Sequence, residues 1–91
     1  MEIRWSPEAA DDIERIYRHI QQNNPAAAKH VTQTLYEECK ALKTFPNRGR
    51  LGREEGSREL IFSPLPYIAV YRVAGNIIEI SRIWHGAQDW P

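Results

Sequence analysis

The chain has 91 residues, which suits one domain spanning residues 1–91 and is too short for two. Apolar residues make up 42% and charged residues 26%, an ordinary globular composition that argues against disorder. Twelve basic and twelve acidic residues cancel, whereas dedicated nucleic-acid binders usually carry a stronger positive charge. Cys39 is the single cysteine, so no intrachain disulfide can form.

Neither a metal nor a cofactor is expected. The histidines at positions 19, 30 and 85 are dispersed and lack the close spacing of a metal site. Gly49, Gly52 and Gly56 do not stand between a strand and a helix start, as a phosphate-binding loop requires. The longest apolar stretches fall far short of the roughly 20 residues of a membrane span, and residues 1–5 do not resemble a signal peptide. We therefore expect a soluble cytoplasmic protein with no membrane partner.

The first half of the chain predicts a strand followed by two helices. Residues 2–5 alternate, which is typical of a strand. Ser6-Pro7 and Asn24-Pro25 each combine a capping side chain with proline, so each predicts a helix start. Apolar residues then recur at helical spacing in two stripes: Ala9, Ile13, Ile16, Tyr17 and Ile20, then Ala28, Val31, Leu35, Cys39 and Leu42. The short connection between them predicts an antiparallel helical hairpin, with Cys39 in the core.

The second half predicts a long loop and a three-stranded meander. Glycine, proline and three arginines gather in residues 46–56, which we expect to be irregular. Residues 58–63, 67–73 and 77–84 read as strands, the last two joined by a tight turn. The fold class is therefore α+β with the order β-α-α-β-β-β, in which the helical hairpin packs on one face of an antiparallel sheet. A ligand or partner would act on the other face.

Pairs of carboxylates on the helices suggest acid-base chemistry but do not support it. Asp11-Asp12 and Glu37-Glu38 are adjacent helical positions, which point about 100° apart. We therefore expect both pairs to lie on solvated faces.

Several segments, in the same order along the chain, resemble the RelE/ParE superfamily of bacterial toxins. They are Trp5-Ser6-Pro7-Glu8-Ala9, Phe45-Pro46, Arg58-Glu59-Leu60, the segment from Pro66 to Val73 and the segment from Ile83 to Gln88. The resemblance spans essentially the whole chain. It implies the toxin of a type II toxin-antitoxin pair, bound by a cognate antitoxin in a hetero-oligomer.

The resemblance leaves the target open between two classes. RelE-like members are metal-independent ribonucleases that cut mRNA on the ribosome and usually carry an arginine on the middle strand, where this chain has Ile68. Under that alternative, His85 would be the acid or base, and Arg82 and Arg72 would hold phosphate. The structural alternatives are a strand-end histidine and cross-strand ion pairs, for example with Glu79.

ParE-like members instead resemble inhibitors of DNA gyrase, and the chain fits them better because of Ile68 and its neutral charge. The protein would then break no bond, so whether it is an enzyme depends on its target. A non-toxic binding module of the same fold is the second alternative. Packing is the alternative role for Tyr67, and we favour Trp90 folding back on the core. The candidate partner-binding residues are Arg48, Arg50, Arg53, Arg58, Tyr67, Gln88 and Trp90.

Overall fold

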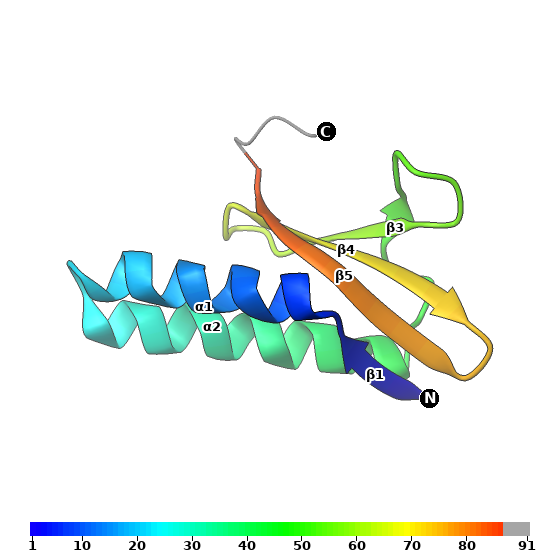
Figure 1. Ribbon diagram of the computed structural model, residues 1–91, viewed down its shortest axis with the longest axis horizontal. Coiled ribbons are helices and arrows are strands. Elements are labelled where there is room, and N and C mark those ends of the chain that lie inside the picture. The colour runs from blue at the N-terminus through cyan, green and yellow to red at the C-terminus, as the bar shows by residue number, and fades with distance from the viewer. Residues whose placement is uncertain (87–91) are drawn as a thin grey trace.

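The computed structural model describes residues 1–86, which form two helices packed on one face of a five-stranded sheet (Figure 1). The strand order across the sheet is β1-β5-β4-β3-β2. The α+β fold class predicted from the sequence is confirmed. In chain order the elements are β1 (Glu2–Trp5), α1 (Pro7–Gln21), α2 (Pro25–Lys40), a 3₁₀ turn (Ala41–Lys43), β2 (Arg50–Leu51), β3 (Arg58–Ile61), β4 (Tyr67–Ala74) and β5 (Ile77–His85).

Both helices begin where the capping residues predict. The Ser6 hydroxyl oxygen accepts a hydrogen bond from the Ala9 amide at 3.0 Å, and Asn24 Oδ1 accepts one from the Ala27 amide at 3.1 Å. A proline follows each cap, where the missing amide hydrogen costs nothing. The connection between the helices is short, so α1 and α2 run side by side as the predicted antiparallel hairpin (Figure 1). Neither is long and apolar enough to cross a membrane, and the same holds for every helix in residues 1–86.

The core lies between the hairpin and the sheet. Cys39 is completely buried there, as its place in the apolar stripe of α2 predicts. Trp5 at the end of β1 is partly buried and packs against Tyr36 of α2, with ring centroids 5.1 Å apart. The buried apolar residues are Ala9, Ile13, Ala28, Leu35, Cys39, Leu42, Leu60, Phe62, Tyr67, Ala69, Tyr71, Ile78, Ile80 and Ile83.

The sheet is mixed, because its first strand joins in the parallel direction. β3, β4 and β5 form the predicted antiparallel meander. β1 instead runs parallel to β5, with Trp5 opposite Ile80. The description of the sheet as antiparallel therefore holds for the meander and not for β1. Residues 50–51, expected to be irregular, form the short edge strand β2.

A β-bulge shifts the register of β5 at Ser81. On β4, Val70 lies opposite Arg82 but the next residue, Tyr71, lies opposite Ile80. One residue of β5 therefore has no counterpart on β4, which is the arrangement of a bulge.

The bulge decides which residues at the end of β5 face the helices. Ile80 and Ile83 are both buried although they are three positions apart, so Ile83 rather than Arg82 faces the core. Ser6 fixes this geometry, because its amide donates to the Ile80 carbonyl at 3.0 Å and its hydroxyl donates to the Ser81 carbonyl at 2.8 Å. The start of α1 is thereby tied to the bulge of β5.

The segment before β3 has little regular structure but is anchored by Tyr71. The Tyr71 hydroxyl accepts a hydrogen bond from the Gly49 amide and donates one to the Pro46 carbonyl, both at 2.8 Å. Arg58 Nη1 donates to the Gly49 carbonyl at 2.7 Å. A Cβ atom on Gly49 would lie 2.7 Å from Tyr71 Cε1, so glycine is required for this close approach.

Candidate functional site

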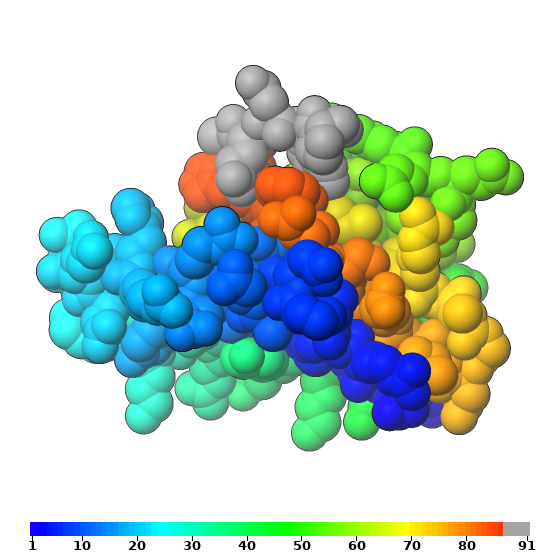
Figure 2. All heavy atoms as spheres, in the orientation of Figure 1, coloured from blue at the N-terminus to red at the C-terminus, as the bar shows by residue number. Residues whose placement is uncertain are grey.

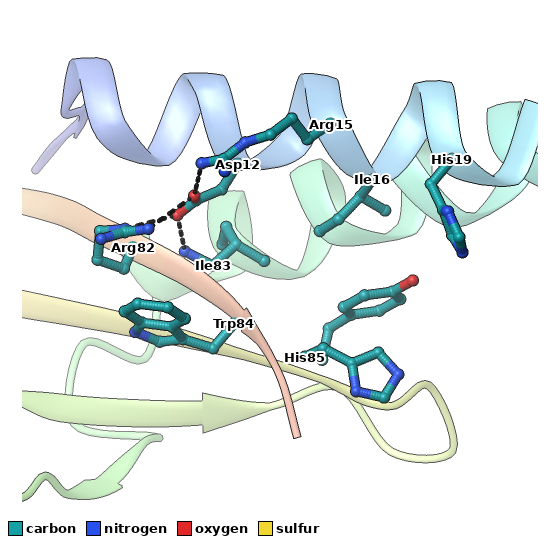
Figure 3. A pocket seen from close by; sticks show the side chains of 9 residues that line it. Asp12, Arg15, Ile16, His19, Arg82, Ile83, Trp84 and His85 are labelled. Atoms are coloured by element: carbon teal, nitrogen blue, oxygen red, sulfur yellow. Dashed lines mark hydrogen bonds and ion pairs between the residues drawn. The ribbon is translucent and has the colours of Figure 1, made fainter. Parts of the chain in front are cut away.

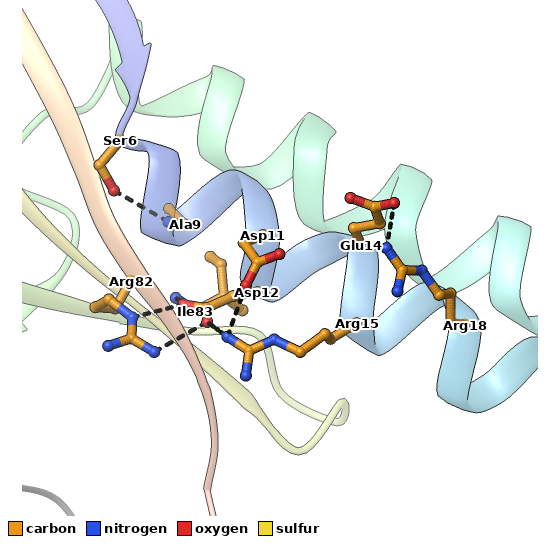
Figure 4. Close-up of polar contacts among 9 residues, drawn as sticks. All are labelled: Ser6, Ala9, Asp11, Asp12, Glu14, Arg15, Arg18, Arg82 and Ile83. Atoms are coloured by element: carbon orange, nitrogen blue, oxygen red, sulfur yellow. Dashed lines mark hydrogen bonds and ion pairs between the residues drawn. The ribbon is translucent and has the colours of Figure 1, made fainter.

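Asp12 joins α1 to the end of β5 (Figure 4). Its Oδ2 accepts hydrogen bonds from Arg82 Nε at 2.8 Å and from the Ile83 amide at 2.9 Å. Its Oδ1 accepts from Arg82 Nη2 at 3.0 Å and from Arg15 Nη2 at 2.9 Å. The Asp12 side chain is only 5% exposed, and these four donors compensate the burial of its charge.

The expectation that Asp11 and Asp12 both lie on a solvated face is wrong for Asp12. Asp11 is exposed and contacts Arg15 at 3.2 Å. Asp12 follows Ala9 by three positions and precedes Ile16 by four, so it lies on the side of α1 that faces the sheet. The two carboxylates diverge as predicted, but the divergence brings one of them into the interior.

Arg82 is held from two sides. Its guanidinium carbon lies 4.1 Å from the centroid of the Trp84 ring, a cation-π contact. The hydrogen bonds from Arg82 to Asp12 raise the pKa of the guanidinium above its ordinary value. The ion pair of Arg82 is thus made with a helix, whereas the structural alternative from the sequence was a cross-strand pair.

A cleft of about 300 Å³ opens between α1 and the end of β5, and we call it the α1–β5 cleft (Figure 3). His85, the predicted acid or base, is exposed and lies at this cleft. Its ring meets the Tyr67 ring edge-on, with centroids 5.5 Å apart. Burial raises the pKa of the Tyr67 hydroxyl. The cleft is lined by Asp12, Arg15, Ile16, His19, Tyr67, Arg82, Ile83, Trp84 and His85.

Arg72 lies at a second, smaller cleft, on the face of the sheet that the helices leave open. This cleft measures about 160 Å³ and is also lined by Arg53 and Arg82. Arg72 donates to the Glu55 carbonyl at 2.7 Å and to Glu54 Oε2 at 3.0 Å. The structure therefore brings Arg82 to one cleft with Arg72 and to the other with His85, and neither of these two clefts of residues 1–86 is lined by all three candidate catalytic residues.

Three of the arginines predicted to bind a partner form ion pairs or hydrogen bonds that fix the segment between α2 and β3 in place. Arg48 pairs with Glu38 of α2 at 2.7 Å. Arg50 donates through Nε and Nη2 to Glu59, whose side chain is 4% exposed, at 3.1 and 2.9 Å. Arg58 donates to backbone carbonyls of the loop.

Two predicted partner-binding residues, Gln88 and Trp90, lie outside the described residues, as does any folding back of Trp90. Within residues 1–86, no three histidine, cysteine or acidic side chains gather as a metal site would require. Asp12 and Glu59 are the buried charges that the sequence interpretation missed.

Comparison with known proteins connects this architecture to toxins. A family model described as the ParE toxin of the type II toxin-antitoxin system parDE matches residues 3–90. A putative toxin of Sinorhizobium fredii, Y4kP, is 35% identical over 98% of this chain and 92% of its own. Toxin RelE2 of Caulobacter vibrioides is 34% identical over 96% of this chain and 97% of its own.

Solved structures agree with the sequence comparisons. A chain of the chromosomal ParDE toxin-antitoxin system from P. aeruginosa superposes with a TM-score of 0.87 and 33% identity, over 93% of this chain and 95% of that one. The YoeB dimer from Staphylococcus aureus, at 22% identity and a TM-score of 0.56, shares the fold, with 90% of this chain and 92% of that one covered. The protein is a toxin of the RelE/ParE superfamily from type II toxin-antitoxin systems. Within that superfamily the chain belongs to the ParE toxin family.

Proposed function

We propose that this toxin inhibits DNA gyrase and is neutralised by a cognate antitoxin. The ParE-like branch that the sequence resembles acts on gyrase, and the solved relatives include a ParDE system and a YoeB-YefM complex. Gyrase lies in the bacterial cytoplasm, where we expect the toxin to act. Under this proposal the toxin works by binding and catalyses no reaction.

The main support for the proposal is that the candidate catalytic arginines already form hydrogen bonds within the protein. A metal-independent ribonuclease needs cationic side chains aimed at a phosphate. Arg82 is instead bound at two points by the buried Asp12, and Arg72 is bound by Glu54 and by the Glu55 carbonyl. Ile68 occupies the middle-strand position where RelE-like enzymes usually carry arginine, and it lies opposite Trp84 in the sheet. These features support a surface that binds a protein over one that cleaves RNA.

The ribonuclease remains the second candidate because relatives at 34% and 29% identity are named RelE2 and RelE1. His85 is its strongest support, since it is exposed at a cleft that also holds Arg82 and Arg15. A non-toxic binding module of this fold is the third candidate function.

Regulated expression in bacteria, followed by assays on the purified chain, tests the proposal. We expect filamentation with an SOS response in cells and loss of gyrase supercoiling in vitro. Co-expression of the antitoxin encoded beside the gene should restore growth. Rapid translation arrest with mRNA cuts on ribosomes, and with gyrase unaffected, would establish the ribonuclease instead. Unchanged growth would point to the binding module.

A further inference from the structure

The two helices form a groove of about 350 Å³ to which no strand contributes a residue, and we call it the hairpin groove. Ile13 of α1 and Thr32 of α2 are nearly buried and form its floor. The Thr32 hydroxyl already donates a hydrogen bond to the Ala28 carbonyl at 2.9 Å. The floor therefore presents mainly apolar surface, which suits an apolar side chain of a ligand. The groove is lined by Ala10, Ile13, Glu14, Tyr17, Thr32 and Tyr36.

Two tyrosines and a small residue shape the walls of the hairpin groove. Tyr36 is 48% exposed, although its ring packs against Trp5, and Tyr17 is half-buried. Ala10 is exposed and has only a Cβ atom, so it leaves room for another element to approach α1. Figure 2 shows α1, in blue, and α2, in cyan and green, adjoining each other at the surface along the hairpin. A groove between two packed helices accepts a ridge of side chains from a third helix.

Lysines border the hairpin groove on the α2 side. Lys29, Gln33, Tyr36 and Lys40 recur at intervals of four, three and four positions, so they lie along one side of α2. Both lysines are exposed, and within residues 1–86 neither forms an ion pair. They are 11 positions apart, which corresponds to about 16 Å along the helix axis. An acidic partner can therefore be held near both ends of the groove.

The acidic side chains nearest the groove leave these lysines available. Glu14, the one charged residue of the described chain that lines the groove itself, is paired with Arg18. Glu37 lies about 100° further around α2 than Tyr36 and accepts a hydrogen bond from Gln33 Nε2 at 3.3 Å. When Glu14, Arg18, Glu37 and the two lysines are counted together, one positive charge is in excess. The border of the groove thus complements an acidic partner, whereas its floor complements an apolar one.

We propose that the hairpin groove binds an amphipathic helix of the antitoxin. Apolar side chains of this helix enter the groove between Tyr17 and Tyr36, and acidic side chains on one flank face Lys29 and Lys40. The spacing of the lysines requires acidic residues toward both ends of the bound helix, with apolar residues between them. This inference rests on the proposed function only in requiring an antitoxin. It does not depend on whether the target is gyrase or the ribosome.

Filling the groove tests where the antitoxin helix binds. The full chain and its Ala10→Trp variant are titrated with the antitoxin encoded beside the gene, and the dissociation constants are compared. Loss of the central contacts of an interface predicts affinity lowered about 10- to 100-fold in Ala10→Trp. The matched control is Ala74→Trp, the same substitution at an exposed alanine of β4, with affinity expected to change less than about twofold. Circular dichroism confirms that both variants are folded.

Reversal of the lysine charges tests the chemistry of the bound helix. In the double variant Lys29→Glu and Lys40→Glu, we expect affinity to fall about 10-fold or more at low salt, with a smaller difference at high salt. The matched control is the pair Lys29→Arg and Lys40→Arg, which keeps the charges and should bind as the wild type does. Acidic residues of the antitoxin helix changed to lysine should restore binding to the double glutamate variant.

The outcomes distinguish failure of this site from failure of the proposed function. If Ala10→Trp binds the antitoxin as tightly as the wild type, or if lysine reversal has no effect, the site is refuted while the proposed function stands. Loss of gyrase inhibition by Ala10→Trp without antitoxin would assign the groove to gyrase, and a dimer dissociated by Ala10→Trp would assign it to a second copy. Either result refutes the site. Antitoxin binding through the groove by a chain that leaves gyrase active refutes the proposed target alone. A wild-type chain that binds no antitoxin refutes both.

Discussion

Asp12 and Arg82 form a two-point ion pair, with Nε to Oδ2 at 2.8 Å and Nη2 to Oδ1 at 3.0 Å, across 70 positions of sequence. The same carboxylate accepts the amide of Ile83, a position at which β1 no longer pairs with β5. The Asp12 carboxylate of α1 therefore accepts the hydrogen bond that a neighbouring strand would otherwise accept from β5. It also orients the Arg82 guanidinium beside Trp84. The end of β5, where the two clefts meet at Arg82, depends on a residue of α1 for its position.

Loss of the Asp12 charge should destabilise the fold. In Asp12→Asn we expect the free energy of unfolding to fall by about 2–4 kcal/mol. Arg82 loses its charged partner, and the NH2 group of the asparagine would face N–H groups that now donate to a carboxylate oxygen. Urea denaturation measures the change. Asp11→Asn is the matched control and should change stability by less than about 0.5 kcal/mol, because Asp11 is exposed. Equal effects of the two substitutions would contradict the structural role of Asp12.

Substitution of Gly49 by alanine should also destabilise the chain. Its Cβ would lie 2.7 Å from Tyr71 Cε1 and 2.9 Å from the Glu59 carbonyl oxygen, and backbone at that distance cannot move away freely. We expect Gly49→Ala to cost about 1–3 kcal/mol, as overpacking does in other cores. Gly86→Ala is the control, since its Cβ would lie at an ordinary 3.5 Å from the Pro66 carbonyl oxygen. Thermal unfolding followed by circular dichroism distinguishes the two variants.

Local signals in the sequence were sufficient to predict the helices and the meander. Ser6 and Asn24 accept the hydrogen bonds that their capping role requires, and most residues of the two apolar stripes form the helical side of the core, although Tyr17 and Ile20 are only half-buried. These features depend on neighbouring residues, so the sequence expresses them directly.

Long-range pairings account for what the sequence did not predict. The parallel contact of β1 with β5 joins strands that lie at opposite ends of the chain, and nothing in either strand specifies its direction. Asp12 was assigned to solvent because adjacent helical positions diverge by about 100°, and no local feature of the sequence indicated its partner Arg82, which lies 70 positions away. The spacing of Asp12 from Ala9 and Ile16 was the one local sign that it lies on the apolar side of α1. Glu59 is buried in the same way against Arg50, across the β2–β3 pair.

The burial of Cys39 predicts a loss of stability in alkaline solution. Desolvation raises the pKa of its thiol from 9.0 to about 12. Below about pH 9 both states keep the proton and stability does not depend on this group. Between pH 9 and 12 the unfolded chain loses the proton while the folded chain retains it, so stability falls by about 1.4 kcal/mol per pH unit.

Urea denaturation at several pH values measures this slope, with Cys39→Ala as the reference. The variant should lose the part of the slope that begins near pH 9 and retain the part due to Tyr67, whose pKa is also raised. A slope that is the same in both proteins would show that Cys39 is not the group responsible.

The role of His85 separates the two candidate activities at the level of one side chain. His85 is an exposed residue that packs edge-on against Tyr67, so His85→Ala should leave the core intact. A general acid or base contributes roughly 10²–10⁴ to a rate, so a ribonuclease should lose that factor in mRNA cleavage on ribosomes. A gyrase inhibitor depends on contacts spread over an interface, in which most single residues contribute little. We therefore expect His85→Ala to retain most of the inhibition of supercoiling, measured over a concentration series alongside the wild type. An inhibition constant raised by a hundredfold or more, in a variant with unchanged thermal stability, would place His85 at the centre of the interface with the target.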